Sequence, residues 1–152
     1  METRCHIDPL PRYMHPQLYE HRRKARAKAH DRYSDIEGAF FVDAAGPVCG
    51  KHTAAVIPQG RQIDCISAQN TDATSMEDAG IAVTLRNPGS IFILTDSQAA
   101  YRNFSKGQIG PLAHRILTQL LSQRSEREWK QLIWIPGHCG VKGNKLAHVS
   151  NR

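Results

Sequence analysis

Short apolar runs separated by turn residues open the main part of the chain. Residues 39–42, 52–57 and 62–68 are rich in apolar and β-branched side chains, and the links between them contain Gly and Pro. Runs of this length joined by short glycine-containing links are typical of strands in antiparallel hairpins. The pattern therefore predicts three successive strands connected by hairpins.

After Asp72 the apolar positions recur at helical spacing, and helices alternate with strands. The segment SIFILT contains four consecutive apolar residues, as expected of a strand that is covered on both faces. The predicted elements, in order, are a helix through Met76–Thr84, a strand over 90–95, a helix over 97–105, a helix from Pro111, a strand over 131–135, and a helix from Val141 that the chain end cuts short.

Three hairpin strands followed by strand–helix units predict an α/β protein with a mixed, five-stranded sheet and helices on both faces. In such sheets, functional residues gather at the carboxyl ends of the parallel strands. The apolar strand over 90–95 is followed at once by Asp96. We therefore expect this strand to hold the Asp96 carboxylate at the rim of the sheet.

The first 36 residues differ in composition from the rest. Three prolines interrupt the beginning, and residues 21–32 (HRRKARAKAHDR) carry six Lys or Arg and one Asp, which accounts for +5 of the formal charge of +6. This basic stretch lacks an apolar stripe for docking on a core. We expect residues 1–36 to be a flexible basic linker or arm and residues 37–152 to be the folded domain.

The charge concentrated in residues 21–32 has two interpretations. The plainer one, which the sequence favours, is a solvated connector. The functional one is a nucleic-acid-binding arm or nuclear-import patch, with Arg22, Arg23 and Lys24 as phosphate contacts. The rest of the chain is close to neutral, so the total charge alone does not establish nucleic-acid binding by the core.

The composition also argues against several classes of protein. No stretch reaches the ~20 apolar residues that a bilayer-spanning helix needs. The N-terminus has no apolar core behind a basic start, as a secretory signal would. The four cysteines are scattered, without CxxC pairs or matching histidines, which argues against a zinc site. We expect an intracellular protein, nuclear or cytoplasmic, that is not secreted and has no membrane partner.

Three acidic residues occupy comparable positions in the predicted fold. Asp43 follows the first strand, Glu77 lies in the first turn of the first helix, and Asp96 follows the fourth strand. If the first and fourth strands are neighbours, the carboxylates share a pocket in which they repel each other unless a cation compensates their charge. Oxygen ligands of this kind suit Mg²⁺ or Mn²⁺. Two such ions, ~4 Å apart, are a known arrangement for phosphodiester cleavage.

Each acid also has a structural explanation when it is taken singly. Asp96 can cap the helix that follows it, Glu77 can stabilise a helix N-terminus, and Asp43 can belong to a turn. For any one acid alone the structural explanation is favoured. The joint placement of all three on this strand order favours the metal site.

Four segments, FVDAAG, EDAGIAVTL, ILTDSQAAYRNF and IWIPGHCGVKGNKLAH, together resemble type 1 ribonuclease H. In detail they are most similar to the ribonuclease H-like domain of LINE-type (non-LTR) retrotransposons, from about Ala39 to the end. TDSQ and WIPGHxGVxGN are the specific motifs, whereas the usual Asp-Gly-Ser is here Asp-Ala-Ala. The resemblance implies a ribonuclease H-like fold and metal-dependent hydrolysis of the RNA strand in RNA–DNA hybrids.

The resemblance also assigns roles to residues and partners. The implied partner is an RNA–DNA hybrid, recognised through 2′-hydroxyl and phosphate contacts. No small-molecule cofactor besides the metal is implied, and the chain is expected to be a monomer or a fragment of a longer polyprotein. The matched residues are Asp43, Glu77 and Asp96 for metal binding and catalysis, Gln98 and Asn144 for nucleic-acid contacts, and His138 for proton transfer or product release.

The position of the family's fourth acid departs from the pattern. In GNKLAH, His148 stands where the family has a metal-binding Asp, and Lys145 adds a positive charge nearby. Neutral imidazole contributes no charge and prefers softer metals, so a two-ion site is expected to weaken toward one ion. Two functions stay open: a hybrid-specific endonuclease, and a catalytically impaired remnant that at most binds nucleic acid. A polynucleotidyl transferase is a third, discounted because TDSQ and PGHxG belong to the nuclease branch.

Overall fold

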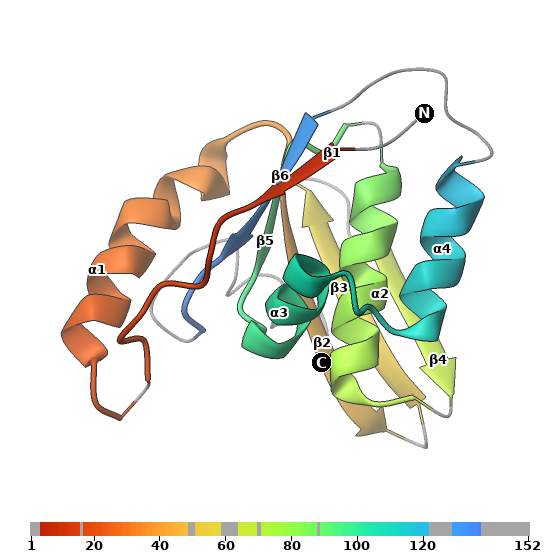
Figure 1. Cartoon of the computed structure of the whole chain (residues 1–152), viewed down its shortest axis with the longest axis horizontal. Coiled ribbons are helices and arrows are strands. Elements are labelled where there is room, and N and C mark those ends of the chain that lie inside the picture. The colour runs from red at the N-terminus through yellow and green to blue at the C-terminus, as the bar shows by residue number, and fades with distance from the viewer. Residues whose placement is uncertain are drawn as a thin grey trace.

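The computed structural model has a mixed sheet that is six-stranded within the described residues, with helices on both sides of it (Figure 1). It describes residues 4–15, 17–48, 51–58, 64–69, 71–87, 89–121 and 129–137. The strands are β1 (Arg4–Ile7), β2 (Ala39–Val48), β3 (Lys51–Pro58), β4 (Asp64–Gln69), β5 (Phe92–Thr95) and β6 (Trp129–Trp134). The helices are α1 (Glu20–His30), α2 (Ala73–Arg86), α3 (Gln98–Lys106) and α4 (Pro111–Leu121), and a short 3-10 helix (Asp31–Asp35) follows α1.

The strands lie in the order β1-β6-β5-β2-β3-β4. β2, β3 and β4 are antiparallel neighbours, whereas β5 runs parallel to both β2 and β6. The predicted succession of three hairpin strands followed by parallel strands is confirmed, and so is the mixed α/β class. The predicted helix from Val141 lies outside the described residues.

The predicted strand number of five is wrong, because β1 adds a sixth strand at the edge of the sheet. β1 pairs in parallel with β6, in a register that joins Cys5 to Lys130 and Ile7 to Leu132. Cys5 and Ile7 are partly buried against the core, while His6 between them is exposed. This alternation is the pattern of a strand, but four residues in a proline-bearing segment are too few to reveal it.

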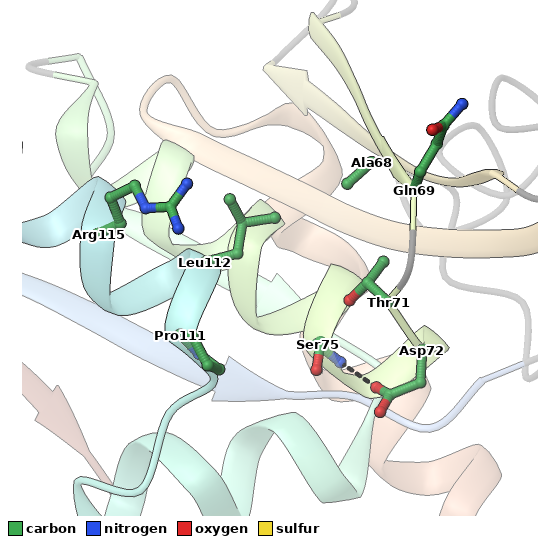
Figure 2. A pocket seen from close by; sticks show the side chains of 8 residues that line it. All are labelled: Ala68, Gln69, Thr71, Asp72, Ser75, Pro111, Leu112 and Arg115. Carbon is green, nitrogen blue, oxygen red and sulfur yellow. Dashed lines mark hydrogen bonds between the residues drawn. The ribbon is translucent and has the colours of Figure 1, made fainter.

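Polar side chains and one glycine set the ends of the helices. The Asp72 carboxylate accepts a hydrogen bond from the Ser75 backbone N–H at 2.7 Å and so begins α2 (Figure 2). Ser97 does the same for α3, and Gly107, with a φ of 70°, ends that helix in the left-handed conformation that glycine tolerates. No helix in the described ranges combines the length and apolar character that a bilayer crossing requires.

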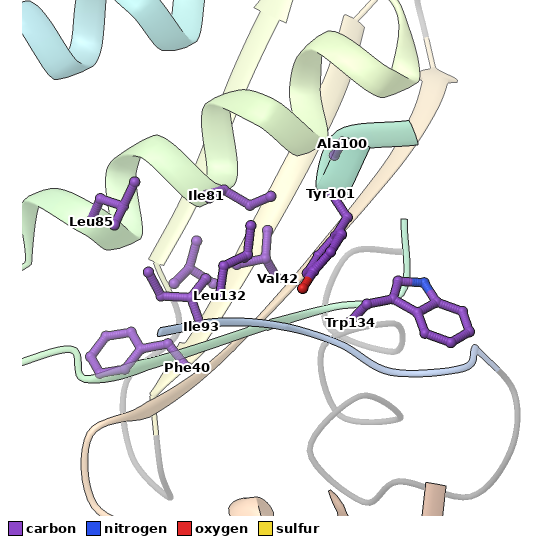
Figure 3. Packing of buried hydrophobic residues seen from close by; sticks show 10 residues of the cluster. Phe40, Val42, Ile81, Leu85, Ile93, Ala100, Tyr101, Leu132 and Trp134 are labelled. Carbon is purple, nitrogen blue, oxygen red and sulfur yellow. The ribbon is translucent and has the colours of Figure 1, made fainter. Parts of the chain in front are cut away.

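The central strands send alternate side chains to opposite faces of the sheet, as the pleat requires. Phe40 and Val42 of β2 belong to one apolar cluster and Phe41 to another. Ile81 and Leu85 of α2 lie over the first cluster (Figure 3). The second cluster lies on the side of α1. Helices therefore cover both faces, as predicted.

A glycine lets α2 approach the sheet closely. A Cβ atom on Gly80 would lie 2.6 Å from Cγ1 of Val42 and 3.2 Å from Cβ of Ala54, distances that require something to shift. Because the backbone of α2 lies this near β2 and β3, a side chain one turn earlier in the helix can reach the edge of the sheet. Glu77 occupies that position.

Residues 1–36, expected to be a basic linker or arm, include segments that pack on the sheet. Besides β1, this region contributes Ala27, which is 1% exposed, and Tyr33, which is 8% exposed, to the apolar cluster on the α1 side. The helix has no apolar stripe, but the small side chain of Ala27 allows it to pack closely on the sheet. The basic face of α1 stays at the surface while Ala27 faces the core.

Candidate metal centre

The strand register brings Asp43 and Asp96 together. β2 and β5 are parallel neighbours, and Val42 is paired with Thr95. An aspartate follows each residue of this pair, and neighbouring positions on adjacent parallel strands lie close together. The predicted adjacency of the first and fourth strands is therefore confirmed.

Glu77 reaches the same place from α2. One carboxylate oxygen each from Asp43, Glu77 and Asp96 lies within 4.8 Å of the others. We call these three residues the acidic cluster. Asp43 and Glu77 are each 6% exposed, and Asp96 is half-buried. Such a cluster can hold a metal ion, as predicted.

The helix-capping and turn roles that the sequence allowed for each single acid are not the roles these acids have in the structure. Ser97, not Asp96, caps α3. Asp72, not Glu77, caps α2, and Glu77 lies in the second turn of that helix instead of the predicted first turn. Asp43 lies within β2 and not in a turn. None of the three acids therefore begins a helix or lies in a turn.

The environment of Glu77 opposes its negative charge. Burial raises the pKa of this carboxyl well above its usual range, and the charges of Asp96 and Asp43 raise it further. Two hydrogen bonds act in the opposite direction: the Ala44 backbone N–H donates to Oε1 at 2.9 Å, and the Thr95 hydroxyl donates to Oε2 at 3.4 Å. A bound cation would favour the charged form and relieve the repulsion.

The segment after β6 packs directly against Asp96. The indole Nε1–H of Trp134 donates to the Asp96 carbonyl at 3.1 Å. A Cβ atom on Gly137 would lie 2.9 Å from the Asp96 Oδ2, so a larger residue would press on the carboxylate. Residues 134–137 therefore fix both the backbone and the side-chain surroundings of Asp96.

Two arginines of α1 hold this segment from outside the sheet. Arg26 donates through Nε and Nη2 to the Trp134 carbonyl at 3.1 and 2.9 Å, and its guanidinium lies 5.6 Å from the centre of a Trp134 ring. Arg23 donates through Nη2 to the Gly137 carbonyl at 3.2 Å. Sequence reasoning missed Arg26 altogether and assigned Arg23 to phosphate binding. Only their spacing around Ala27 could have indicated an inward-facing side of α1.

The other predicted nucleic-acid contacts lie at the surface. The Arg22 guanidinium is 5.0 Å from the ring centre of Tyr13, and Lys24 forms an exposed ion pair with Glu20 at 3.0 Å. Gln98 is the first residue of α3 and is half-buried. The structure thus separates Arg22 and Lys24, which point outward, from Arg23, which contacts the protein. His138, Asn144 and His148 lie outside the described residues, and their roles remain predictions.

A cavity of about 510 Å³ lies where the start of α2 meets the start of α4 (Figure 2). Nothing in the sequence predicted it. None of the acidic cluster lines it, and the Asp72 carboxylate at its rim is occupied in capping α2. Its lining consists of Ala68, Gln69, Thr71, Asp72, Ser75, Pro111, Leu112 and Arg115.

No model of a known protein family matches the chain. The resemblance to type 1 ribonuclease H therefore rests on the four sequence segments. The fold class and the acidic cluster stand independently of that resemblance.

Proposed function

We propose that this protein is a metal-dependent endonuclease of the ribonuclease H type, derived from a retrotransposon, which hydrolyses the RNA strand of RNA–DNA hybrids. The observation that carries the proposal is the acidic cluster, whose carboxylates come from separate elements to within 4.8 Å of one another. The sequence resemblance, above all TDSQ and WIPGHxGVxGN, supplies the reaction and the substrate.

The acidic cluster would hold Mg²⁺ or Mn²⁺, since hard oxygen ligands suit these ions. When bound, such ions activate a water molecule and stabilise the leaving oxygen of a phosphodiester. The protein's own contribution is a fixed ligand set. The Ala44 N–H and Thr95 hydroxyl orient the Glu77 carboxylate, and Trp134 holds the Asp96 backbone.

In this proposal Gln98 contacts the hybrid. It begins α3 two residues after Asp96, so the two Cα atoms are at most ~7 Å apart. A side-chain amide can both donate to and accept from base edges and 2′-hydroxyls in the wide minor groove of such a duplex. This position supports recognition of the hybrid by its shape.

A second candidate function is a catalytically impaired remnant that binds nucleic acid without cleaving it. His148, in place of the family's fourth acid, is the observation that favours it. Loss of one charged ligand weakens binding of a second hard cation, and two-ion cleavage depends on both ions.

Cleavage of an end-labelled RNA–DNA hybrid, resolved on a gel with and without Mn²⁺ or Mg²⁺, tests the proposal. We expect metal-dependent fragments from the natural protein and none from Asp96→Asn. Asp35→Asn, at an exposed position in the 3-10 helix, is the matched control and should cleave normally. Equal cleavage by the Asp96→Asn variant would overturn the proposal.

Isothermal titration with Mn²⁺ separates the two candidates. Binding that is lost in Asp96→Asn supports an operating metal site, whereas no binding at millimolar Mn²⁺ supports the remnant. His148→Asp restores the family's fourth acid. If His148 is what limits the site, this variant should bind a second ion and cleave faster than the natural protein.

A further inference from the structure

A cavity of about 550 Å³ is lined by the N-terminal region and by α3, the helix that begins two residues after Asp96 of the acidic cluster. It lies between residues 10–15 and the first two turns of α3, where Gln98 and Arg102 line it. Gln98, which lines the cavity, follows Asp96 of the acidic cluster by two residues, so this part of the cavity lies near the proposed catalytic site. The N-terminal wall of this cavity is a part of the chain to which neither the motifs nor the proposed function assign a role.

Several contacts fix that wall in place. Leu10 and Met14 pack against the apolar cluster beneath α2. The Tyr101 hydroxyl of α3 donates a hydrogen bond to the Asp8 carbonyl. Together with the pairing of β1 to β6, these contacts hold residues 10–15 in a defined position on the fold.

The polar side chains of the wall are cationic or aromatic. Arg12 and His15 are exposed on it, and Arg102 faces it from α3. The eight described residues that line the cavity include no acid. A surface of this composition suits a polyanion that also has flat, stackable groups.

Tyr13 is held outward at a conformational cost. Its φ is 61°, and it is the one non-glycine residue with positive φ in the described ranges. A side chain such as tyrosine rarely adopts this conformation, and residues held so are found at ligand-binding sites. The Tyr13 side chain is 52% exposed, it meets the Tyr19 ring edge-on at 5.2 Å, and the Arg22 guanidinium lies over the ring at 5.0 Å from its centre, which leaves the opposite face for a base. The backbone thus presents an aromatic ring beside the cavity instead of burying it.

We propose that this cavity is a subsite for a single nucleic-acid strand where it leaves the hybrid. Arg12 and Arg102 bind its phosphates, and Tyr13 stacks on an unpaired base. A cavity of about 550 Å³ accommodates a nucleotide but not a duplex, and a base can stack on a side chain only when it is free of its partner. The inference rests on the proposed function, because the acidic cluster sets where the hybrid lies.

Fluorescence anisotropy tests the subsite without any cleavage. The full chain carrying Asp96→Asn is titrated, without divalent metal, against a blunt RNA–DNA hybrid and against the same hybrid with a single-stranded extension at one or the other end. We expect one extension to tighten binding about tenfold, as one stacked base with its phosphates would. Equal affinity for the blunt hybrid and both extended hybrids would overturn the subsite.

Substitutions made in that background locate the effect. Tyr13→Gly suits a φ of 61°, so it should keep the melting temperature and abolish the gain from the extension. Arg12→Ala with Arg102→Ala should lower the salt dependence of log K by about 0.7 for each arginine. Arg86→Ala, exposed at the far end of α2, is the matched control and should change neither. An undiminished gain in the Tyr13→Gly variant would also overturn the subsite.

The results distinguish this inference from the proposed function. Metal-dependent cleavage by the natural protein, combined with equal affinity for blunt and extended hybrids, would overturn the subsite and leave hybrid hydrolysis standing. Extension-dependent binding without cleavage in Mn²⁺ would support the subsite and overturn hydrolysis.

Discussion

The two ends of β5 and β6 bury charge in opposite ways. At the amino ends, Lys130 of β6 is 2% exposed, and its ammonium donates to the Asn87 carbonyl at 2.9 Å, the Ser90 carbonyl at 2.6 Å and the Ser90 hydroxyl at 2.7 Å. An ammonium has three N–H donors, so protein oxygens alone satisfy it. At the carboxyl end of β5, beside β2, the acidic cluster gathers three acidic groups.

This difference distinguishes a structural site from a candidate ligand site. Around Lys130, each donor has an oxygen supplied by the same fold, and the burial of charge holds the loop between α2 and β5 to the edge of the sheet. In the acidic cluster, hydrogen bonds to Glu77 oppose its raised pKa, but the neighbouring aspartates work against them. Two carboxylates at about this separation repel each other by on the order of 3 kcal/mol at an effective dielectric constant of 20. A cation bound from outside would relieve that repulsion.

The largest effect is expected from removing the buried ammonium of Lys130 at the amino ends of the strands. Lys130→Met removes three N–H donors and leaves the acceptor oxygens of Asn87 and Ser90 without them. We therefore expect the free energy of unfolding to fall by about 3 kcal/mol or more, and the melting temperature by about 10 °C. Urea unfolding and calorimetry measure this. Lys106→Met, at an exposed lysine of α3, should change stability by less than about 0.5 kcal/mol. A similar small change in Lys130→Met would mean that the buried ammonium is not structural.

The second largest effect is expected when a divalent cation is added to the acidic cluster. A ligand present at a hundred times its Kd stabilises the folded state by about 2.7 kcal/mol, which raises the melting temperature of a chain this size by roughly 5–10 °C. Saturating Mn²⁺ should produce such a shift, and EDTA should reverse it. Asp96→Asn should abolish the shift, whereas Lys130→Met should melt lower but keep it. A shift of equal size in Asp96→Asn would place the metal elsewhere.

The sequence predicted most of the acidic cluster but not the buried site of Lys130. Asp96 could be placed because an uninterrupted apolar strand precedes it, and the strand order put Asp43 beside it. Lys130 could not, since a lysine at the start of an amphipathic strand ordinarily faces solvent. Its partners are mainly backbone carbonyls, which a sequence does not display. Asn87 appeared only as part of a helix stop.

The elements of the N-terminal region were not predicted either, for a related reason. Expecting a flexible arm rested on the absence of an apolar stripe in α1. The contacts that hold α1 are a single small side chain, Ala27, and two arginines that donate to backbone carbonyls. Hydrophobic periodicity does not register contacts of this kind, and β1 is too short to be recognised without its partner strand.

A smaller effect is expected when one charge is taken out of the acidic cluster. Glu77→Gln keeps an oxygen to accept from the Ala44 N–H but removes the repulsion, so the metal-free protein should gain about 1 kcal/mol at neutral pH. Thermal unfolding without metal measures the gain. Glu37→Gln, at an exposed position, should show none. A loss of stability in Glu77→Gln would mean that the charge of Glu77 is compensated within the protein.

The pH dependence of stability should change in the same variant. The folded-state pKa of Glu77 is raised above the ordinary value of 4.5. Between these two values the folded protein holds a proton that the unfolded chain has lost, so the free energy of unfolding falls as the pH rises through this window. Glu77→Gln should flatten that slope, and Glu37→Gln should leave it unchanged.

The smallest change in stability is expected from a variant outside both sites. It tests whether protein contacts hold the acidic cluster as firmly as they hold Lys130. Arg26→Ala removes the donors to the Trp134 carbonyl, and Trp134 in turn holds the Asp96 backbone. We expect a loss of about 1 kcal/mol in stability and about tenfold weaker Mn²⁺ binding by isothermal titration, as when a group behind a metal ligand is removed. Lys28→Ala, exposed on the same helix, should change neither, and Arg26→Lys should recover part of the affinity because one donor remains. If stability falls but Mn²⁺ affinity does not, α1 supports only the fold, and the ligand geometry at the carboxyl ends is set by the sheet alone.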